Sequence, residues 1–224
     1  NTRLVGSEMC IRDRPYCVHD LLEVGMDEAG RGPMFGRVYV AGVIIPPDET
    51  FSQEFIKDSK KLGERKKLMA FDFIKENAID WVVEYKDEKY IDEYNIYVAN
   101  YNAMHDALNK LLVEPEHILV DGNYFKPYCS PSGKFINHTT VVKGDNEYAS
   151  IAAASILAKV SRDKYVEEMC DKYPQLDEYY SLRSNKGYAS KKHLDGIRKY
   201  GCTKFHRKSF GLCKTSKEII LVGQ

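Results

Sequence analysis

The sequence predicts an α/β protein in which helices flank a mixed β-sheet and a helical extension follows at the C-terminus. Two observations lead to this class. β-rich runs come first, strand-like and helical patterns then alternate, and only helical patterns follow residue 147. In addition, a chain of 224 residues is long enough to bury a substantial core.

Short apolar or β-branched runs predict the strands. Residues 21–27 and 37–45 are two such runs joined by a Gly/Pro turn, which favours a β-hairpin. Further strands are expected at residues 79–85, 116–122 and 139–142. The stretch 124–137, which contains Pro, Ser and Gly, is expected to be a loop.

Apolar residues at helical spacing predict helices over residues 60–77, 93–113, 147–172 and 190–199. Residues 150–155 of the longest helix are nearly all small. Small side chains allow a helix to pack closely on a sheet, and such packing would hold Asp145, just before this helix, in place.

The N-terminal residues 1–16 show no periodicity and no initiating Met, and we expect them to be a non-native or disordered leader. We expect residues 17–224 to form a single domain. Its core would span about residues 21–172, and a basic C-terminal helical region would span about residues 173–217.

The composition excludes several classes of protein. No apolar run approaches the roughly 20 residues that cross a membrane, so no membrane span is predicted. The six Cys residues form no Cys-x-x-Cys pair, which favours free thiols in a reducing compartment over a disulfide or zinc framework. We therefore expect a cytoplasmic protein.

Acidic residues end three of the predicted segments: Asp27-Glu28, Asp121 and Asp145. Functional sites of open α/β sheets collect at strand ends. Four neighbouring carboxylates would repel one another unless cations compensate, and oxygen ligands of this kind suit Mg²⁺ or Mn²⁺. Two such ions are the usual apparatus for displacement at phosphorus. Because adjacent strand residues point to opposite faces, we expect the strand to break near Asp27 so that both acids can reach metal.

A Gly-Arg-Gly sequence follows the first acidic pair directly. Gly30 and Gly32 would let a ligand approach the main chain, whose N–H and C=O groups could then bond a sugar hydroxyl. Arg31 would add a charged fork suited to phosphate. Each of these residues alone is more simply explained by turn chemistry, whereas their combination is not.

The charge distribution favours a polyanionic partner although the net charge is zero. Residues 183–217 contain eleven Lys or Arg and one acid, Asp195. Aromatic residues are interleaved with these bases, and interleaving of this kind favours nucleic-acid contact over a merely solvated face. The aromatic set is Tyr188, Tyr200, Phe205, His206 and Phe210.

These segments, in this order, resemble the ribonuclease HII family over about residues 24–210. The matching motifs are DEAGRGP (27–33), DSKKL (58–62), IDEYNI (91–96), ILVDGN (118–123), KGD (143–145), SIAAASILAKVSRD (150–163), NKGY (185–188) and HRKSF (206–210). The resemblance implies the ribonuclease H-like fold. It also implies a hydrolase that cleaves the RNA strand of RNA–DNA hybrids and cuts 5′ to ribonucleotides embedded in duplex DNA. The products would carry 5′-phosphate and 3′-hydroxyl ends, and the role would be ribonucleotide removal in DNA replication and repair.

The resemblance also implies roles for single residues. Asp27, Glu28, Asp121 and Asp145 look like the four metal-binding carboxylates of a Mg²⁺ or Mn²⁺ site. The remaining implied residues contact substrate: Gly30, Arg31 and Gly32 resemble the motif that senses the 2′-hydroxyl, Tyr188 resembles the tyrosine at the RNA–DNA junction, and Ser59, Lys60 and Lys61 resemble a backbone-contacting segment.

The sequence departs from the family pattern at a few positions. Phe35 and Arg37 replace a small residue and a proline, which could reshape the turn after Arg31. The 124–137 stretch is longer than expected, and no sliding-clamp motif is evident at the C-terminus. We expect a monomer.

Three other functions were weighed. Another two-metal nuclease on the same core would share the carboxylates without needing Gly-Arg-Gly or Tyr188. A non-catalytic nucleic-acid-binding module would be expected to have lost one of the acids, and all four are present. A glycosidase could use Asp27 and Glu28 as its carboxylate pair, but that reading leaves the basic tail unexplained.

Overall fold

The computed structural model describes residues 17, 21–46, 51, 56 and 63–222 of the chain, and a six-stranded mixed sheet forms its centre. The sheet has the strand order β3-β2-β1-β4-β6-β5. Its strands are β1 (Glu23–Ala29), β2 (Val38–Ile44), β3 (Asp80–Lys86), β4 (His117–Asp121), β5 (Tyr128–Cys129) and β6 (Phe135–Val141).

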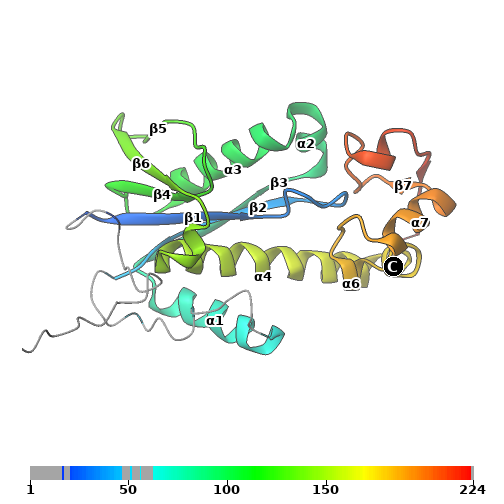
Figure 1. Cartoon of the computed structure of the whole chain (residues 1–224), viewed down its shortest axis with the longest axis horizontal. Coiled ribbons are helices and arrows are strands. Elements are labelled where there is room, and N and C mark those ends of the chain that lie inside the picture. Colours follow the sequence, from blue (N-terminus) through cyan, green and yellow to red (C-terminus); the bar gives the residue numbers. More distant parts are fainter. Residues whose placement is uncertain (1–16, 18–20, 47–50, 52–55, 57–62, 223–224) are drawn as a thin grey trace, which may run out of the picture.

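Strand direction divides the sheet into two parts. β1, β2 and β3 form an antiparallel meander, so the predicted hairpin is confirmed. β1, β4 and β6 run parallel to one another, with Met26 opposite Val120 and Asp121 opposite Val141. The carboxyl ends of these three strands therefore meet at one edge of the sheet, as Figure 1 shows.

The expectation of a loop over residues 124–137 is wrong in part, because β5 and the start of β6 form a hairpin there. Lys134 and Ser130 flank its turn, in which the Ser130 N–H donates to the Lys134 carbonyl at 2.9 Å. Gly133 adopts a φ of 85°, a left-handed conformation that suits glycine. A two-residue strand such as β5 is too short to show an alternating pattern in the sequence.

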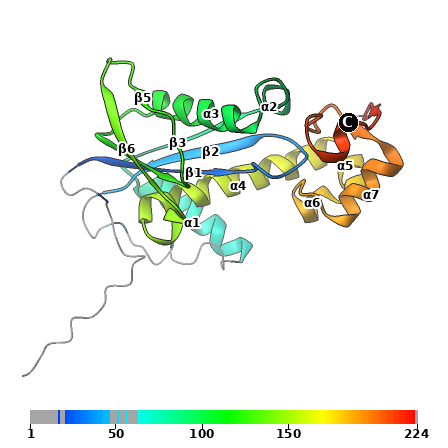
Figure 2. The same cartoon turned by 45° about the horizontal axis from the view of Figure 1, so that its top comes forward.

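Helices cover both faces of the sheet (Figures 1 and 2). One face carries α3 (Ile96–Lys110), whose Met104 and Leu108 pack on Val40 and Val82. The other face carries α4 (Ala149–Lys172), and α1 (Glu64–Asn77) packs outside α4. The predicted flanking helices are thus confirmed, and the sheet between them separates two apolar cores.

The single helix expected over residues 93–113 is two helices, α2 (Glu88–Tyr94) and α3. Asn95 breaks the run with a φ of 70°, a left-handed value that Asn tolerates better than most residues. Its side chain then caps α3 by accepting hydrogen bonds from the N–H groups of Tyr97 at 2.9 Å and Val98 at 3.1 Å.

The long helix α4 lies very close to β1. A Cβ atom on Gly25 would stand 2.3 Å from the carbonyl carbon of Ser150, so only glycine fits there. The small residues 150–155 permit this approach, as predicted. The contact fixes α4, and the 3₁₀ turn η3 (Gly144–Asn146) before it, relative to the end of β1.

A C-terminal region extends the structure beyond the sheet around the last turns of α4 (Figure 1). The predicted helix at 190–199 is confirmed as α7, whose N-cap Ser190 accepts from the His193 N–H at 3.2 Å. The sequence patterns gave no indication of the short elements around it. This region contains α5 (Gln175–Tyr180), α6 (Leu182–Asn185), α7 (Lys191–Tyr200), β7 (Cys202–Thr203), η4 (Gly211–Lys214) and β8 (Glu218–Ile219).

Two expectations from composition can be compared with the described residues. Their Cys residues are all free thiols, as predicted: Cys17, Cys129, Cys170, Cys202 and Cys213. None of the described helices combines the length and the apolar character that a bilayer crossing requires.

Candidate active site

Asp27 lies near the end of β1 on the face that α4 covers, and its side chain is only 4% exposed. Burial, and next the neighbouring Glu28 carboxylate, raise the pKa of Asp27 to about 7, while Ser155 and Lys159 of α4 act in the opposite direction. In this environment the ionised form of Asp27 is much less stable than it is in water.

Glu28 points to the opposite face of the sheet, toward α3. The expected break in the strand is wrong: β1 stays paired with β2 through Glu28 opposite Val40 and Ala29 opposite Tyr39, and only its parallel pairing with β4 ends at Met26. Alternation along this regular strand separates the two acids. The Glu28 carboxylate accepts a hydrogen bond from Arg31 at 3.1 Å. Burial raises the pKa of Glu28, and Arg31 opposes this rise.

Asp121 ends β4, the strand beside β1, and is within electrostatic reach of both Asp27 and Glu28. Its Oδ1 accepts a hydrogen bond from the Gly144 N–H at 2.8 Å, which ties β4 to the turn η3. Asp145 is the next residue in that turn, three residues before the α4 N-cap Tyr148. The structure therefore brings all four predicted acids to one edge of the sheet.

The donor set at this edge fits a hard divalent cation such as Mg²⁺ or Mn²⁺, because it consists of carboxylate oxygens. The raised pKa of the buried Asp27 shows where positive charge would relieve repulsion. In the arrangement that the structure describes, however, no three His, Cys, Asp or Glu side chains are close enough together to enclose an ion. Glu28 points to the other face of β1 from Asp27, so its side chain would have to turn for both carboxylates to bind one ion.

A buried arginine holds the loop that follows β1. Arg207 is fully buried, and its guanidinium donates to five main-chain carbonyls of that loop. The acceptors are Gly30 (2.6 Å), Pro33 (2.7 Å), Gly36 (2.8 Å), Arg37 (3.0 Å) and Arg31 (3.1 Å). The carbonyls of Gly30 and Arg31, which we expected to face a sugar hydroxyl, therefore already accept hydrogen bonds from Arg207.

The two predicted sensing elements lie side by side. A Cβ atom on Gly32 would stand 3.5 Å from the ring of Tyr188, which is half exposed. For the N–H groups of Arg31 and Gly32, no partner is found among the described residues, so these two main-chain donors remain available. Gly30 has a different role, because its φ is 95° and the buried side chain of Arg162 fills the space beside it.

A chain of hydrogen bonds supports Tyr188 from behind. The Thr203 N–H donates to His206 Nδ1 at 3.1 Å, and His206 Nε2 lies 3.1 Å from His193 Nε2. His193 Nδ1 lies 2.9 Å from the Tyr188 carbonyl. Each hydrogen bond in this chain needs one donor. Neutral imidazoles satisfy this requirement if His206 donates through Nε2 to His193 and His193 donates through Nδ1 to the Tyr188 carbonyl. His206, one of the aromatic set that favoured nucleic-acid contact, is instead fully buried and supports the C-terminal region.

The two unusual residues after Arg31 both pack against aromatic side chains, Phe35 in the C-terminal region and Arg37 on β3 and α4. Phe35 is fully buried and packs edge-on against Phe205 and His206, with ring centroids at 6.4 and 5.3 Å. The Arg37 guanidinium lies over the rings of Tyr85 at 3.9 Å and Tyr165 at 4.6 Å. The turn at Arg31 is therefore anchored by aromatic packing on both sides.

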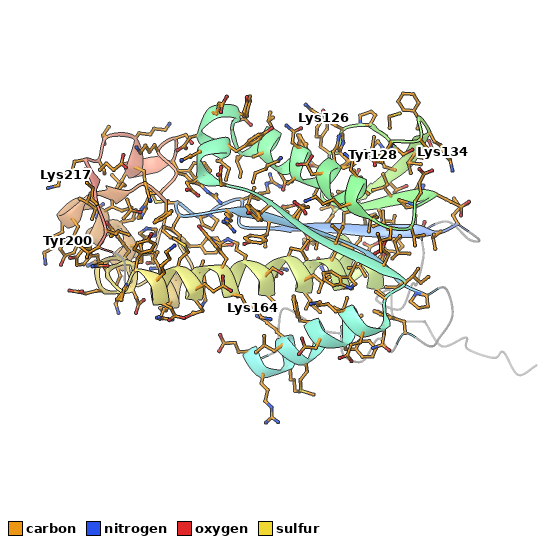
Figure 3. All side chains as sticks on the ribbon, turned by 180° about the vertical axis from the view of Figure 1, so that it is seen from behind. Lys126, Tyr128, Lys134, Lys164, Tyr200 and Lys217 are labelled. Atoms are coloured by element: carbon orange, nitrogen blue, oxygen red, sulfur yellow. The ribbon has the colours of Figure 1, made fainter. Side chains whose placement is uncertain are left out.

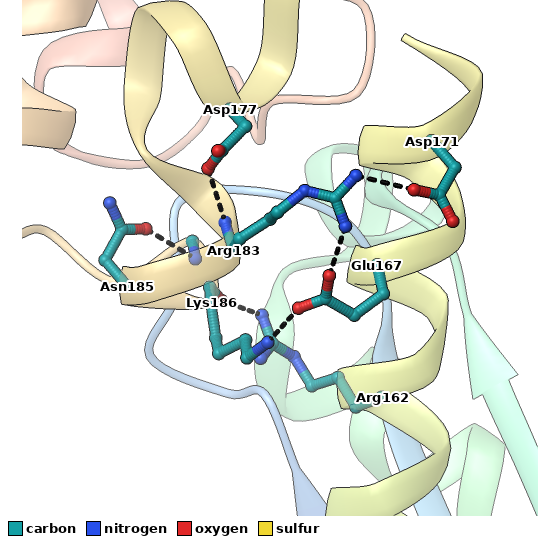
Figure 4. Close-up of polar contacts among 8 residues, drawn as sticks. Arg162, Glu167, Asp171, Asp177, Arg183, Asn185 and Lys186 are labelled. Carbon is teal, nitrogen blue, oxygen red and sulfur yellow. Dashed lines mark hydrogen bonds and ion pairs between the residues drawn. The ribbon is translucent and has the colours of Figure 1, made fainter. Parts of the chain in front are cut away.

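The basic tail is partly neutralised within the protein. Figure 4 shows Arg183 and Lys186 of the C-terminal region bound to Glu167 of α4, and Arg183 also reaches Asp171 at 2.5 Å. Lys191 and Arg198 pair with Asp195 on α7 itself. Among the lysines of residues 183–217, those with no acidic partner in the described part of the chain are Lys192, Lys199, Lys204, Lys214 and Lys217.

Sequence reasoning did not single out Arg207, His193 or Arg162 as support for the site. Arg207 stands in the quoted HRKSF motif, but its partners are about 170 residues away in the chain, and no local pattern signals such a contact. Three predicted residues, Ser59, Lys60 and Lys61, lie outside the described residues.

The sequence of this chain matches known proteins over most of its length. A model of the family described as Ribonuclease HII matches residues 24–213. Ribonuclease HII of Phocaeicola vulgatus is 45% identical over 205 residues, which cover 92% of this chain and 96% of that protein. Ribonuclease HII of Parabacteroides distasonis is 47% identical over 198 residues, or 88% of this chain and 94% of the relative.

Solved structures confirm the fold class. The ribonuclease H2 crystal structure from Pyrococcus horikoshii superposes with a TM-score of 0.69 at 25% identity, covering 86% of this chain and 95% of that one. Ribonuclease HII of Archaeoglobus fulgidus, solved in complex with PCNA, gives a TM-score of 0.69 at 22% identity over 85% of this chain and 96% of that one. Bst ribonuclease HIII in complex with Mn²⁺ gives 0.60 at 20% identity, over 94% of this chain and 69% of that one. The chain thus belongs to the ribonuclease HII family and is a hydrolase of the ribonuclease H class.

Proposed function

We propose that this protein cleaves the RNA strand of RNA–DNA hybrids and cuts 5′ to ribonucleotides embedded in duplex DNA. The observation that carries the proposal is the contact between two distant segments: Gly32 of the Gly-Arg-Gly loop lies against the ring of Tyr188, next to the acidic edge of the sheet. A general nuclease on the same core needs the acids but has no need of this contact.

In the proposed reaction, Asp27, Glu28, Asp121 and Asp145 hold two Mg²⁺ or Mn²⁺ ions. When bound, the ions would provide the water activation and charge stabilisation that displacement at phosphorus needs. The burial of Asp27 and the hydrogen bond from Gly144 to Asp121 keep two of these carboxylates in place before substrate arrives. Cleavage leaves a 5′-phosphate and a 3′-hydroxyl.

Selection for ribose rests on the loop held by Arg207. The N–H groups of Arg31 and Gly32 are the donors that a 2′-hydroxyl would meet, since Arg207 occupies the carbonyls. The half-exposed ring of Tyr188 packs against the sugar at the RNA–DNA junction and so places the scissile phosphate. Ser59, Lys60 and Lys61, together with the unpaired lysines of the C-terminal region, contact the phosphate backbone.

The test uses a labelled DNA duplex with one ribonucleotide, an all-DNA duplex of the same sequence, Mg²⁺, and the Asp27→Asn variant. We expect a single cut 5′ to the ribonucleotide, no cut in the all-DNA duplex, and a loss of activity in the variant of at least a thousandfold. Tyr188→Ala provides a second arm, in which cleavage at the single ribonucleotide falls more than cleavage of a long hybrid.

Equal cutting of both duplexes by the wild-type protein would contradict the ribose check and favour a general two-metal nuclease. Tight binding of either duplex without cleavage, repeated with Mn²⁺ and on long hybrids, would favour a non-catalytic binding module.

A further inference from the structure

A row of tyrosines on the surface begins beside Arg31 and continues along α3, next to the segment that follows Asp121. We call it the tyrosine shelf and define it as Tyr97, Tyr101, Tyr124 and Lys126. Tyr97 and Tyr101 come from α3, and Tyr124 and Lys126 come from the segment that follows Asp121. The shelf therefore joins two elements that also bound the candidate active site.

Contacts connect Tyr97 to Arg31 at one end of the shelf and join Tyr101 to Tyr124 and Lys126 at the other. The Arg31 guanidinium lies over the Tyr97 ring at 5.4 Å, and the Tyr101 and Tyr124 rings meet edge to face at 5.1 Å. The Lys126 ammonium lies 5.8 Å from the centre of the Tyr101 ring. Figure 3 shows Lys126 on the α3 side of the molecule, away from Lys164 on α4.

Core packing does not explain these aromatic side chains. Tyr97 is 58% exposed and Tyr124 is 56% exposed, although each presents a large apolar ring to solvent. Clustered exposed aromatics beside a functional site mark binding surfaces more often than single exposed rings do. The positive groups at the two ends, Arg31 and Lys126, indicate that the ligand is an anion.

The dimensions of the shelf fit a nucleic-acid strand. Tyr97 and Tyr101 are one turn apart on α3, about 6 Å along its axis, and the segment 124–126 extends the row further. Tyr hydroxyls and Lys ammonium groups are common donors to phosphate oxygens in protein–nucleic acid complexes. Tyr rings also offer flat faces to sugars and bases.

We propose that the tyrosine shelf binds the sugar–phosphate backbone of one substrate strand on the α3 side of the acidic edge. This inference rests on the proposed function for the identity of the substrate. The shelf sets substrate affinity and length dependence, whereas the acidic edge performs the cleavage. Removing a shelf side chain therefore raises KM and leaves kcat nearly unchanged.

The test compares Tyr124→Ala, Tyr124→Phe and Lys126→Gln with the wild-type protein. Tyr124 is chosen because it is exposed and has no contact with Arg31, so its removal leaves the sensing loop intact. Phe135→Ala is the matched control. Phe135 is a 76% exposed aromatic at the start of β6, about 20 Å along the strand from its carboxyl end.

The substrates are duplexes with one ribonucleotide, shortened in steps of two base pairs from either end. The wild-type protein is expected to lose affinity as one particular end is shortened past the shelf. Tyr124→Ala is expected to raise KM for the full-length duplex five- to tenfold, to change kcat less than twofold, and to be insensitive to shortening of that end. Tyr124→Phe shows an intermediate effect, and Lys126→Gln reduces the slope of log affinity against log salt by about 0.9.

Binding is measured in parallel by anisotropy with the Asp27→Asn variant in the absence of divalent metal, so failure of the proposed cleavage does not hide the shelf. If Tyr124→Ala and Phe135→Ala show the same KM and the same length dependence as wild type, the shelf does not bind substrate. A fall in kcat at unchanged KM would also overturn the inference, since it would place Tyr124 in the chemistry rather than in binding.

Discussion

The buried histidine pair predicts that acid weakens the fold at the point where Tyr188 is supported. His206 accepts from the Thr203 N–H through Nδ1, so its only proton sits on Nε2 and faces Nε2 of His193. A second proton on either ring would set two N–H groups against each other, or an N–H against a main-chain donor. The pair is therefore stable only while both imidazoles are neutral.

The size of this loss of stability follows from the pKa of His206. Burial, followed by the neighbouring His193, lowers this pKa from 6.5 to about 3. Because the pKa of the folded state lies below that of the unfolded state, the stabilisation is fully present above pH 6.5. It falls as the pH drops from 6.5 toward 3. Lowering the pH from 7.5 to 5.0 therefore reduces the free energy of unfolding by about 2 kcal/mol through His206 alone. The pKa of His193 is lowered in the same direction by burial, so it adds to the loss.

The assay is urea denaturation at pH 7.5 and pH 5.0 for the wild-type protein, His206→Gln and His193→Gln. The substitutions will lower stability at pH 7.5, but the informative quantity is the difference between the two pH values. We expect this difference to shrink by about 2 kcal/mol in His206→Gln relative to wild type.

The reasoning is refuted if wild type and His206→Gln lose equal stability between the two pH values. An equal loss would mean that His206 binds a proton as readily in the folded protein as in the unfolded chain, which its full burial and its partners forbid.

Three further predictions concern the loop and the acids. Arg207→Lys keeps the positive charge but loses the planar guanidinium that bonds the five carbonyls. We expect urea unfolding to show a loss of about 2–4 kcal/mol in the free energy of unfolding. A loss below about 0.5 kcal/mol would contradict the role given to these contacts. In metal-free protein the raised pKa of Asp27 makes its ionisation destabilising as the pH rises from 3.8 to about 7. Asp27→Asn should therefore be more stable than wild type at pH 8 by up to about 4 kcal/mol, with no such gain at pH 3.5; an advantage at pH 3.5 as large as that at pH 8 would argue against this account. Phe35→Ala removes a fully buried ring and should lower the unfolding free energy by about 3–5 kcal/mol, whereas an unchanged denaturation midpoint would show that the ring is not part of the packing.

Local patterns in the sequence predicted the elements that form by local rules. The acids at the ends of β1 and β4 could be located because strands and their ends show in the order of apolar and polar residues. The break at Asn95 could not, because helical spacing continues across it and only a single left-handed residue separates α2 from α3. The regular course of β1 through Glu28 was also missed, since pairing with β2 overrides the local preference of the glycines that follow.

The supports of the site escaped prediction for a different reason. Arg207 contacts Gly30 and Arg37 across about 170 residues, and His193 and His206 meet across a turn and a helix. The sequence shows these residues as members of a basic, aromatic tail, which favours a surface role. In the structure these residues are buried and bonded inside the protein. Their burial and their partners depend on how the C-terminal region folds back onto the loop after β1, which no local pattern shows.

The span of the Arg207 contacts determines when, during synthesis, the loop can acquire its shape. As the chain leaves the ribosome from its N-terminus, β1 and β2 can pair early, and β4 and α4 can join them later. The carbonyls of Gly30 and Pro33 must wait for a residue 174 or more positions later in the chain. A nascent or prematurely terminated chain that lacks residue 207 therefore carries the acids of β1 and β4 without a formed sensing loop. Under the proposed function, the ability to select ribose would therefore arise only after residue 207 has joined a sheet that is already in place.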